Sequence, residues 1–414
     1  MTQTSELDLA SSQSSEISLT SAEFKANPYP TFARLRACDP VYQYASSDDA
    51  HTTWLVTRYA DAEMVLQDAR FVKDRQHLSS PLGPRHPPSS AASPDDLFGM
   101  GLLSFDPPDH TRLRTLVNPF FTPRQLEQQR ARIQAIADEL IDDVAERGRM
   151  DLIEDFAFPL PMRVISEILG IPAEDRAQLH QWFKVIADVL DDPVAYQQAS
   201  WCFQAVFDYV RDVIERKRQA PANDVITVLL EAEGEQISPR ELVSMVFVLI
   251  LTGHETTANL IGNGMLALMT HPEQLALIRD NPTLIKPAVE EFLRYHSPVT
   301  LSTFRWARED IELGGKVIRR GDGVVVSLSS ANRDETAFAQ PDHPHLKRSE
   351  NRHLAFGKGI HYCLGAPLAR LEGQIAINTL VRRLPQLRLA VDPDTLEWRP
   401  GSTVMGVYHL PVVF

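Results

Sequence analysis

The chain has 414 residues, of which 43% are hydrophobic, and its 41 basic and 55 acidic residues give a formal net charge of −14. An acidic balance argues against nucleic acid as the main partner, because phosphate backbones bind cationic surfaces. The length is ample for a large buried core, and no Gly/Ser-rich or Pro-rich linker divides the middle of the chain.

The first residues of the chain and its cysteines indicate the cellular compartment of the protein. Residues 1–19 are rich in Ser, Thr, Gln and Glu and lack the features of a signal peptide, which predicts a disordered tail. Cys38, Cys202 and Cys363 are far apart and odd in number, which argues against a disulfide framework and fits a reducing cytoplasm. The longest strongly apolar run, residues 245–251, is too short to cross a bilayer, so we expect a cytoplasmic protein without a membrane partner.

The elements predicted along the chain are mostly helices. After a strand at 53–56, an irregular loop at 77–95 contains five prolines, and Thr122 caps a helix that Gly148 closes. Helices follow at 161–169, 174–190, 199–218, 238–270, 284–296 and from about 366, with strands at 311–313, 317–318, 324–328 and 404–414. This order predicts a mainly α fold with small β-sheets rather than a doubly wound α/β sheet.

The helix at 238–270 has an unusual polar centre. It begins with a capping box and is apolar nearly all round, yet its middle reads Thr252-Gly-His-Glu-Thr-Thr257. Burying a carboxylate and hydroxyls without partners costs on the order of several kcal/mol, so something must compensate. Two structural alternatives to a functional role stay open: Thr256 could bond the carbonyl four residues earlier, and Glu255 could form a buried ion pair. We expect His254 to be structural.

A glycine-rich loop carries one free thiol. Phe356-Gly-Lys-Gly-Ile-His-Tyr-Cys-Leu-Gly-Ala-Pro367 places Cys363 just before a helix with Pro in its first turn. The helix dipole and the free N–H groups of that turn favour a thiolate, which is a metal ligand or a nucleophile. The alternative is a buried free Cys in a Gly-rich turn.

The spacing Phe356-x-x-Gly359-x-x-x-Cys363-x-Gly365 resembles the cysteine loop of the cytochrome P450 (haem-thiolate monooxygenase) family. The helix centre, the Glu-x-x-Arg at 291–294 and the segment 106–114 are similar to further motifs of that family, in the family's order. The resemblance implies the cytochrome P450 fold, with a single triangular-prism-like haem domain at 20–414 and a long central helix across the haem. It also implies haem b as cofactor and O2 as co-substrate.

The resemblance carries roles over to individual residues. Cys363 would be the axial iron ligand, Glu255 and Thr256 would relay protons and steady the oxygen, Gly253 would make room for it, and Thr252 stands where the family has Ala or Gly. A buried network would contain Glu291, Arg294 and, in place of a usual Arg, His343, which would make it sensitive to pH. The implied haem-binding residues are His110, Arg114, Arg305, His361, Phe356, Gly357 and Gly365, whereas Arg112 should point elsewhere. The expected substrate pocket contains Phe98, Met100, Met245, Leu249, Val299, Leu301, Thr303, Val404 and Met405; by spacing alone, Met245 and Leu249 would be core.

The implied activity is insertion of one oxygen atom from O2 into a hydrophobic small molecule such as a polyketide or macrolide, a steroid or a fatty acid. The chain shows no flavin or dinucleotide segment, so we expect electrons from NAD(P)H to arrive through a separate ferredoxin and ferredoxin reductase. The basic residues Lys347, Arg348, Arg352 and Lys358 would form the docking patch for such an acidic partner, and we expect a monomer.

Two other functions remain alternatives. A haem-thiolate peroxygenase driven by peroxide would need no redox partner. Such an enzyme could dispense with a proton relay, so the presence of Glu255 and Thr256 argues against this alternative. A non-catalytic haem- or metal-binding sensor could use His353, His361 and Cys363 around zinc, but no fourth ligand has suitable spacing.

Overall fold

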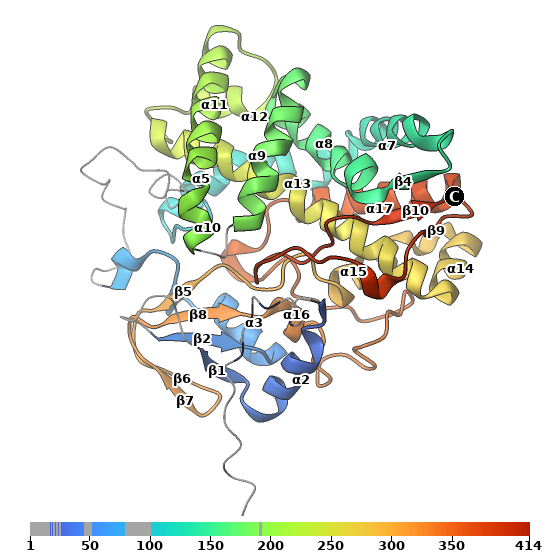
Figure 1. Ribbon diagram of the computed structural model, residues 1–414. Coiled ribbons are helices and arrows are strands. Elements are labelled where there is room, and N and C mark those ends of the chain that lie inside the picture. The colour runs from blue at the N-terminus through green and yellow to red at the C-terminus, as the bar shows by residue number, and fades with distance from the viewer. Residues whose placement is uncertain are drawn as a thin grey trace, which may run out of the picture.

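The computed structural model describes residues 17, 19, 21, 24, 26–44, 52–78, 101–189 and 193–414. Nearly all of the expected tail, most of the proline-containing loop, and the pocket candidates Phe98 and Met100 lie outside these residues. The described chain forms a large helical part and a smaller part built on a β-sheet (Figure 1).

Helix α13 (Pro239–Thr270) runs through the middle of the helical part (Figure 1). Its most extensive packing is against α8 (Pro159–Leu169), and it also contacts α11 (Ser200–Gln219), α15 (Ile285–Tyr295) and α17 (Ala366–Arg383). The other α-helices are α2 (Tyr29–Cys38), α3 (Tyr59–Gln67), α5 (Asp109–Val117), α6 (Pro123–Glu127), α7 (Arg130–Ala145), α9 (Arg176–Val189), α10 (Pro193–Gln198), α12 (Val225–Glu231), α14 (Pro272–Asp280) and α16 (Leu328–Ala331).

The strands form three small sheets. A five-stranded sheet has the order β1-β2-β8-β5-β3, in which only β2 and β8 pair in parallel, with Thr53 opposite Gly323. A three-stranded sheet has the order β4-β10-β9, and β6 with β7 forms a hairpin. Their bounds are β1 (Val41–Tyr44), β2 (Thr53–Val56), β3 (Phe71–Val72), β4 (Arg149–Asp151), β5 (Arg305–Ala307), β6 (Ile311–Leu313), β7 (Lys316–Ile318), β8 (Gly323–Val326), β9 (Arg388–Leu389) and β10 (Pro411–Val413).

The start of α13 confirms the predicted capping box. The Ser238 hydroxyl accepts the Glu241 N–H at 3.3 Å, and the Glu241 carboxylate accepts the Ser238 N–H at 2.8 Å. By length and composition α13 could cross a membrane, but 78% of its most apolar window is buried within the protein. That burial is typical of a core helix.

Three predicted elements differ in extent. The helix expected after Thr122 divides into α6 and α7, which are separated by a turn at 128–129. Strand β8 ends at Val326 because Ser327 caps α16. The strand expected at 404–414 reduces to β10 and two isolated bridges, Val299–Val404 and Trp398–Val407, because backbone bonds such as Met405 N–H to Pro298 C=O tie this segment to other parts of the chain.

Candidate active site

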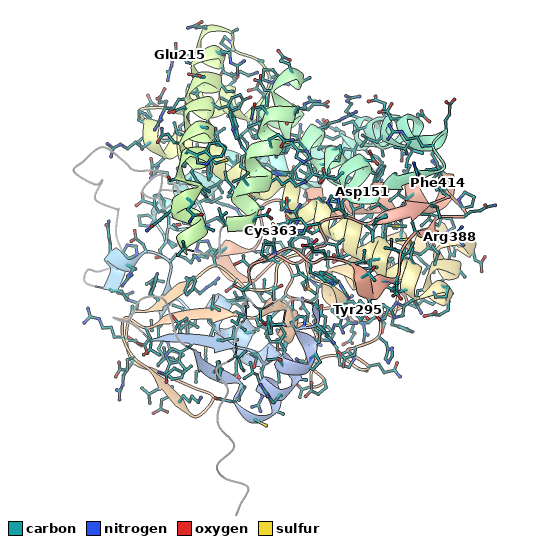
Figure 2. The ribbon with its side chains drawn as sticks, viewed as in Figure 1. Asp151, Glu215, Tyr295, Cys363, Arg388 and Phe414 are labelled. Carbon is teal, nitrogen blue, oxygen red and sulfur yellow. The ribbon has the colours of Figure 1, made fainter. Side chains whose placement is uncertain are left out.

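The loop before α17 holds Cys363 near the middle of the molecule, beneath α13 (Figure 2). The Cys363 N–H donates to the Phe356 carbonyl at 3.0 Å, which closes the loop on itself. Gly359 has a φ of +75°, and a Cβ there would lie 2.6 Å from the Leu66 carbonyl oxygen of α3. Only glycine therefore allows this close approach.

The charge state of Cys363 depends on two opposing effects. Burial raises the pKa of the thiol, whereas the N–H groups of Gly365 and Ala366 and the guanidinium of Arg114 act to lower it. The donors predicted from the helix start are in place, but the predicted preference for a thiolate is outweighed by burial in the protein alone. A thiolate at this position therefore calls for a further cation, such as a metal ion.

Basic side chains from three segments, α5, β5 and the cysteine loop itself, gather around this loop. The His110 ring of α5 lies 4.4 Å from the ring of His361, measured between centroids. Arg114 donates to the Tyr362 carbonyl at 2.8 Å, and the buried Arg305 donates to the Thr303 carbonyl at 3.2 Å. The structure thus brings together the four basic residues that the sequence assigned to haem binding.

Lys73 is a fifth basic residue of this group, which sequence reasoning missed. Its side chain is buried, and its ammonium donates to the Thr303 hydroxyl and the Phe304 carbonyl, both at 2.5 Å. Burial, followed by the charge of Arg305, holds its pKa well below the usual range, although Asp106 opposes this. A lone lysine directly after an apolar strand was the available signal.

These residues fit an anionic ligand. Burial and then the positive charges of Lys73, His110, Arg305 and Arg114 lower the pKa of His361 to about 2. Within the described chain, the Nε2 atoms of His110 and His361 are buried without a hydrogen-bond partner. An excess of buried positive charge with unused ring nitrogens matches the two propionates of haem.

The polar centre of α13 is partly accessible to solvent although most of the rest of the helix is buried, and we call this accessible stretch the window of α13. From Leu242 to Leu268, Thr252, Gly253 and Thr256 are the positions that are not buried. The Thr256 hydroxyl donates to the Thr252 carbonyl at 3.1 Å, and that of Thr252 donates to the Val248 carbonyl at 2.8 Å. The back-bonding alternative for Thr256 is therefore observed, and the hydroxyl remains accessible.

Gly253 has a packing role that sequence reasoning did not provide. A Cβ at this position would lie 2.7 Å from Cγ1 of Ile165 on α8. The absent side chain therefore lets α13 approach α8 closely. This close approach explains the glycine without reference to a ligand.

Glu255 combines an ion pair with an unused oxygen. Its Oε1 lies 3.4 Å from Nε of the buried Arg399, whose Nη1 lies 3.2 Å from Asp188 on α9. No hydrogen bond to Oε2 is found within the described chain. Burial raises the pKa of Glu255, although Arg399 acts to lower it. Burial thus favours the protonated form of this carboxyl more than that of an exposed glutamate.

His254 points into the core. Its ring packs edge-on to Phe158 and Phe183, with centroids 5.0 and 5.1 Å away, and its Nδ1 lies 2.7 Å from the Ile250 carbonyl. This contact matches the expected structural role.

Glu372 of α17 is a second buried acid that sequence reasoning missed. It is fully buried, and neither carboxyl oxygen has a hydrogen-bond partner among the described residues. Burial raises its pKa well above the usual range, with Thr257 of α13 opposing this. Its position between Leu371 and Ile375 on the apolar face of α17 was the available signal.

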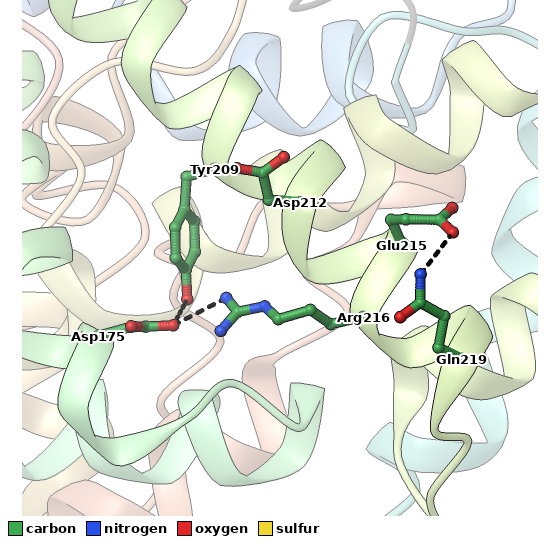
Figure 3. Close-up of a pocket in the computed structure, with 6 residues that line it drawn as sticks. All are labelled: Asp175, Tyr209, Asp212, Glu215, Arg216 and Gln219. Carbon is green, nitrogen blue, oxygen red and sulfur yellow. Dashed lines mark hydrogen bonds and ion pairs between the residues drawn. The ribbon is translucent and has the colours of Figure 1, made fainter.

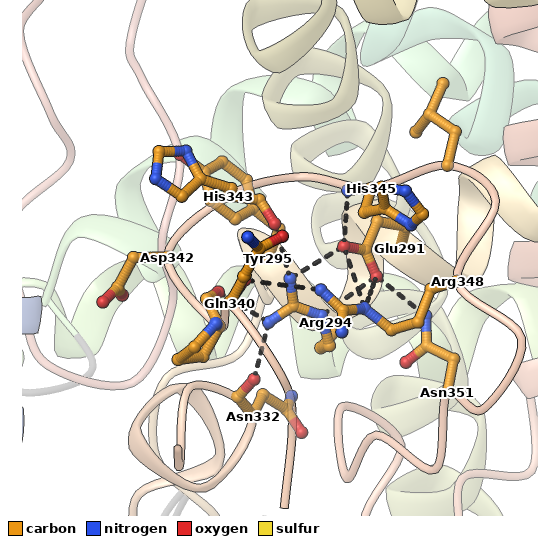
Figure 4. A network of polar contacts seen from close by, with 12 residues as sticks. Glu291, Arg294, Tyr295, Asn332, Gln340, Asp342, His343, His345, Arg348 and Asn351 are labelled. Atoms are coloured by element: carbon orange, nitrogen blue, oxygen red, sulfur yellow. Dashed lines mark hydrogen bonds and ion pairs between the residues drawn. The ribbon is translucent and has the colours of Figure 1, made fainter.

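The Glu-x-x-Arg pair of α15 is buried in a closed network (Figure 4). All five N–H groups of Arg294 have acceptors: the Glu291 carboxylate twice and the carbonyls of Asn332, Pro341 and His343. Although burial opposes it, hydrogen bonds from Arg294 above all hold the pKa of Glu291 below its usual range.

The third member of this network is Arg348, not His343. The Arg348 Nε donates to Glu291 Oε2 at 3.1 Å, whereas His343 contributes only its backbone carbonyl and exposes its side chain. The assignment of His343 was wrong because a guanidinium can reach from the following turn of the same loop. The pH sensitivity expected from a histidine loses its basis with it.

The expected basic patch is correspondingly smaller. Arg348 is committed to Glu291, Lys358 pairs with Glu63 of α3, and the exposed Arg352 lies 3.4 Å from Glu350. Arg112 pairs with Asp109 and with Glu241 of α13, away from the cysteine loop, as expected.

The expected pocket residues divide into two groups. Val299 and Val404 lie side by side in a β-bridge, and Thr303 accepts a hydrogen bond from Lys73. Met245, Leu249, Leu301 and Met405 are 0%, 7%, 5% and 2% exposed. Leu301 packs with Phe32 and Leu55 in the core beside the sheet, and Met245 belongs to the core around α13. For Met245 and Leu249 the alternative of simple core packing accounts for their burial.

A surface hollow lies elsewhere in the molecule. It has a volume of about 510 Å³ and is lined by Asp175, Tyr209, Asp212, Glu215, Arg216 and Gln219 (Figure 3). Glu215 lies at the far end of α11 from Cys363 (Figure 2). Asp175 already accepts bonds from Tyr209 at 2.8 Å and Arg216 at 2.9 Å, so this hollow plays no part in the cysteine site.

The described residues contain no group of three His, Cys, Asp or Glu side chains arranged to hold a metal ion. The zinc arrangement of His353, His361 and Cys363 therefore has no geometric support. His353 instead lies 3.0 Å from Glu290.

Comparison with known proteins matches the family model described as Cytochrome P450 to residues 51–399. Vitamin D(3) 25-hydroxylase of Pseudonocardia autotrophica is 42% identical, over 95% of each chain. Cytochrome P450 monooxygenase PikC of Streptomyces venezuelae is 42% identical, over 94% of this chain and 92% of that protein. The crystal structure of the myxobacterial cytochrome P450 CYP267B1 with myristic acid is 42% identical, with a TM-score of 0.87, and the match covers 96% of this chain and 98% of that one.

Proposed function

The chain belongs to the cytochrome P450 family and is a haem-dependent monooxygenase, and from this premise we propose that Cys363 is the axial ligand of haem b. The observation that carries the proposal is the combination of a half-buried thiol, receiving N–H groups at a helix start, with an excess of buried positive charge beside it. We further propose that residues 20–414 form one haem domain.

The basic cluster would hold the haem through its propionates. His110, Arg114, Arg305 and His361 supply donors, and Lys73 adds a buried charge next to Arg305. Phe356, Gly357 and Gly365 would form the loop surface around the sulfur. When bound, the haem supplies the activation of dioxygen, and the protein positions the reactants and supplies protons.

Glu255 would supply those protons. The raised pKa of its carboxyl allows Oε2 to hold a proton, and the accessible hydroxyl of Thr256 lies one residue along the same helix. The Thr252 hydroxyl, also exposed in the window, would contact substrate or water. Such a relay favours a monooxygenase that consumes dioxygen over the peroxide-driven alternative.

The substrate would be a hydrophobic small molecule. Vitamin D3 and myristic acid, named for two of the related proteins, are apolar, which supports a polyketide, steroid-like or fatty-acid substrate here. Val299 and Val404 would contribute apolar side chains, which lie next to each other in a β-bridge.

Electrons would come from NAD(P)H through a ferredoxin and its reductase in the cytoplasm. Lys347, Arg352 and Lys358 are the remaining candidates for the docking patch, because Arg348 is occupied by Glu291. Charge reversal at Arg352 and Lys358 should slow the first electron transfer and weaken its salt dependence. Unchanged rates would place the docking surface elsewhere.

The carbon monoxide complex of the reduced, haem-loaded protein tests the assignment of Cys363. The wild type should show the red-shifted absorption band of thiolate-bound haem, and Cys363→Ala should lose it. Cys202→Ala is the matched control, since Cys202 is a buried thiol whose Sγ donates to the Trp182 carbonyl. A thiolate-type band that survives in Cys363→Ala would overturn the proposal.

A further inference from the structure

Two neighbouring acids of α15 serve different networks. Glu291 turns to Arg294 and Arg348, as described above, whereas Glu290 turns to Arg370 of α17 and to His353. Glu290 accepts two parallel bonds from Arg370, Nε to Oε1 at 2.8 Å and Nη2 to Oε2 at 2.9 Å. A bidentate pair of this kind fixes the orientation of the guanidinium.

Arg370 in turn contacts both sides of the cysteine loop. Its Nη1 donates to the Tyr362 hydroxyl at 2.9 Å, and its Cζ lies 4.6 Å from the centre of the Phe356 ring. Tyr362 directly precedes Cys363, and Phe356 accepts the Cys363 N–H. The guanidinium held by Glu290 therefore contacts Tyr362 and Phe356, the two residues that position the sulfur.

The charges of this group act on the sulfur in opposite directions. The guanidinium of Arg370 presents a positive charge to the loop through Tyr362, and the carboxylate of Glu290, bound to its Nε and Nη2, offsets that charge. Although burial opposes it, hydrogen bonds from His353 and Arg370 lower the pKa of Glu290 to about 2, so it is ionised throughout the physiological range. The charge balance near the sulfur is therefore set by a permanent pair.

We propose that Glu290 is a positioning residue that sets the reduction potential of the bound haem, because it holds Arg370 against Phe356 and Tyr362 and neutralises its charge. This inference rests on the proposed role of Cys363 as the haem ligand. It assigns to Glu290 and Arg370 an electrostatic function separate from that of the Glu291 network.

Potentiometric titration of the haem-loaded protein tests the proposal. Glu290→Gln leaves the charge of Arg370 unopposed, so the potential should shift to more positive values, because added positive charge favours the reduced state. Arg370→Gln should shift it to more negative values. The double variant should lie between the two single variants, near the wild type, because both charges are then absent.

Glu350→Gln is the matched control. Glu350 is also an acid paired with an arginine of the loop region, but both partners are more than three-quarters exposed, so solvent screens the pair and no shift is expected. Should Glu290→Gln fail to accumulate as folded protein, the comparison of Arg370→Gln with the double variant carries the same test.

The possible outcomes distinguish the role of Glu290 from the role of Cys363 as haem ligand. A thiolate-type carbon monoxide band in Glu290→Gln together with a potential equal to that of Glu350→Gln would overturn the role of Glu290 while Cys363 remains the ligand. A wild type without that band would overturn the assignment of Cys363 itself. A shift that is the same in both single variants would show a structural rather than an electrostatic effect, and would also overturn the proposal.

Discussion

On the cysteine side of the site, every N–H of Arg294 has an acceptor, and Glu291 receives donors from Arg294, His345, Arg348 and Asn351. On α13, by contrast, Glu255 has one ion-pair contact at 3.4 Å, and its Oε2 has no hydrogen-bond partner among the described residues. Both acids are buried, so the difference is not one of exposure. A completed network holds a loop in one arrangement, whereas an incomplete one leaves a proton-carrying group ready for water or another partner.

The largest expected effect comes from opening the completed network. Glu291→Gln removes the charge that compensates Arg294 and Arg348, and should lower the free energy of unfolding by about 3 to 5 kcal/mol. Chemical denaturation measures this change. His343→Ala is the control and should change the stability by less than about 0.5 kcal/mol, because only its backbone carbonyl is used. A comparable loss in His343→Ala would show that its side chain belongs to the network after all.

The second prediction concerns the incomplete side. Glu255→Gln removes the proton carried at Oε2 and should reduce coupled turnover by roughly 100-fold or more, with a larger solvent isotope effect. The measurement is the amount of product formed per NAD(P)H consumed, together with the rate, in light and in heavy water. Glu154→Gln, which alters an acid that pairs with Lys184 at 2.7 Å, should remain near the wild type. Full coupled turnover in Glu255→Gln would make the pair with Arg399 purely structural.

A third, smaller effect tests why the window of α13 contains glycine. Gly253→Ala improves helix propensity by about 1 kcal/mol but forces a methyl group against Ile165, so we expect a net loss of stability of about 1 to 2 kcal/mol. Adding Ile165→Val should recover part of that loss in a thermal or chemical unfolding experiment. If the second substitution recovers nothing, the contact with α8 does not explain the glycine.

The last prediction is a pH dependence of the stability, which arises on the cysteine side. The pKa of Glu290 is lowered from 4.5 to about 2, so the unfolded state binds more protons than the folded state between these values. The free energy of unfolding therefore decreases as the pH is lowered through this range. The stabilising contribution is complete above about pH 4.5 and is lost toward about pH 2. The stability difference between wild type and Glu290→Gln should therefore shrink on acidification. A difference that stays constant would mean that this ion pair adds nothing to stability.

Local features of the chain were predictable because their signals lie within a few residues. The capping box of Ser238 and Glu241, the hairpin around Gly314 and Gly315, and the helix that begins at Ala366 all follow from spacing along one segment. The five expected basic and thiol residues, His110, Arg114, Arg305, His361 and Cys363, were identified by motif and are brought together by the fold.

The residues that sequence reasoning missed or misassigned depend on contacts between distant segments. Arg348 reaches Glu291 across 57 positions, Arg399 reaches Glu255 from the last part of the chain, and Lys73 meets Arg305 through the pairing of β3 with β5. No periodicity connects such pairs. Likewise, Gly253 was expected to make room for oxygen, and only the packing of α13 on α8 revealed its contact with Ile165.

By itself, the sequence determined which elements form and which residue types carry the chemistry, because hydrogen-bonded caps, turns and helical stripes are local. The tertiary structure decided which charges are paired and which are left open, because burial and Coulomb interactions depend on distances in space. That decision separates the closed network around Glu291 from the open carboxyl of Glu255. It also places Glu290, unremarkable in the sequence, behind the cysteine loop.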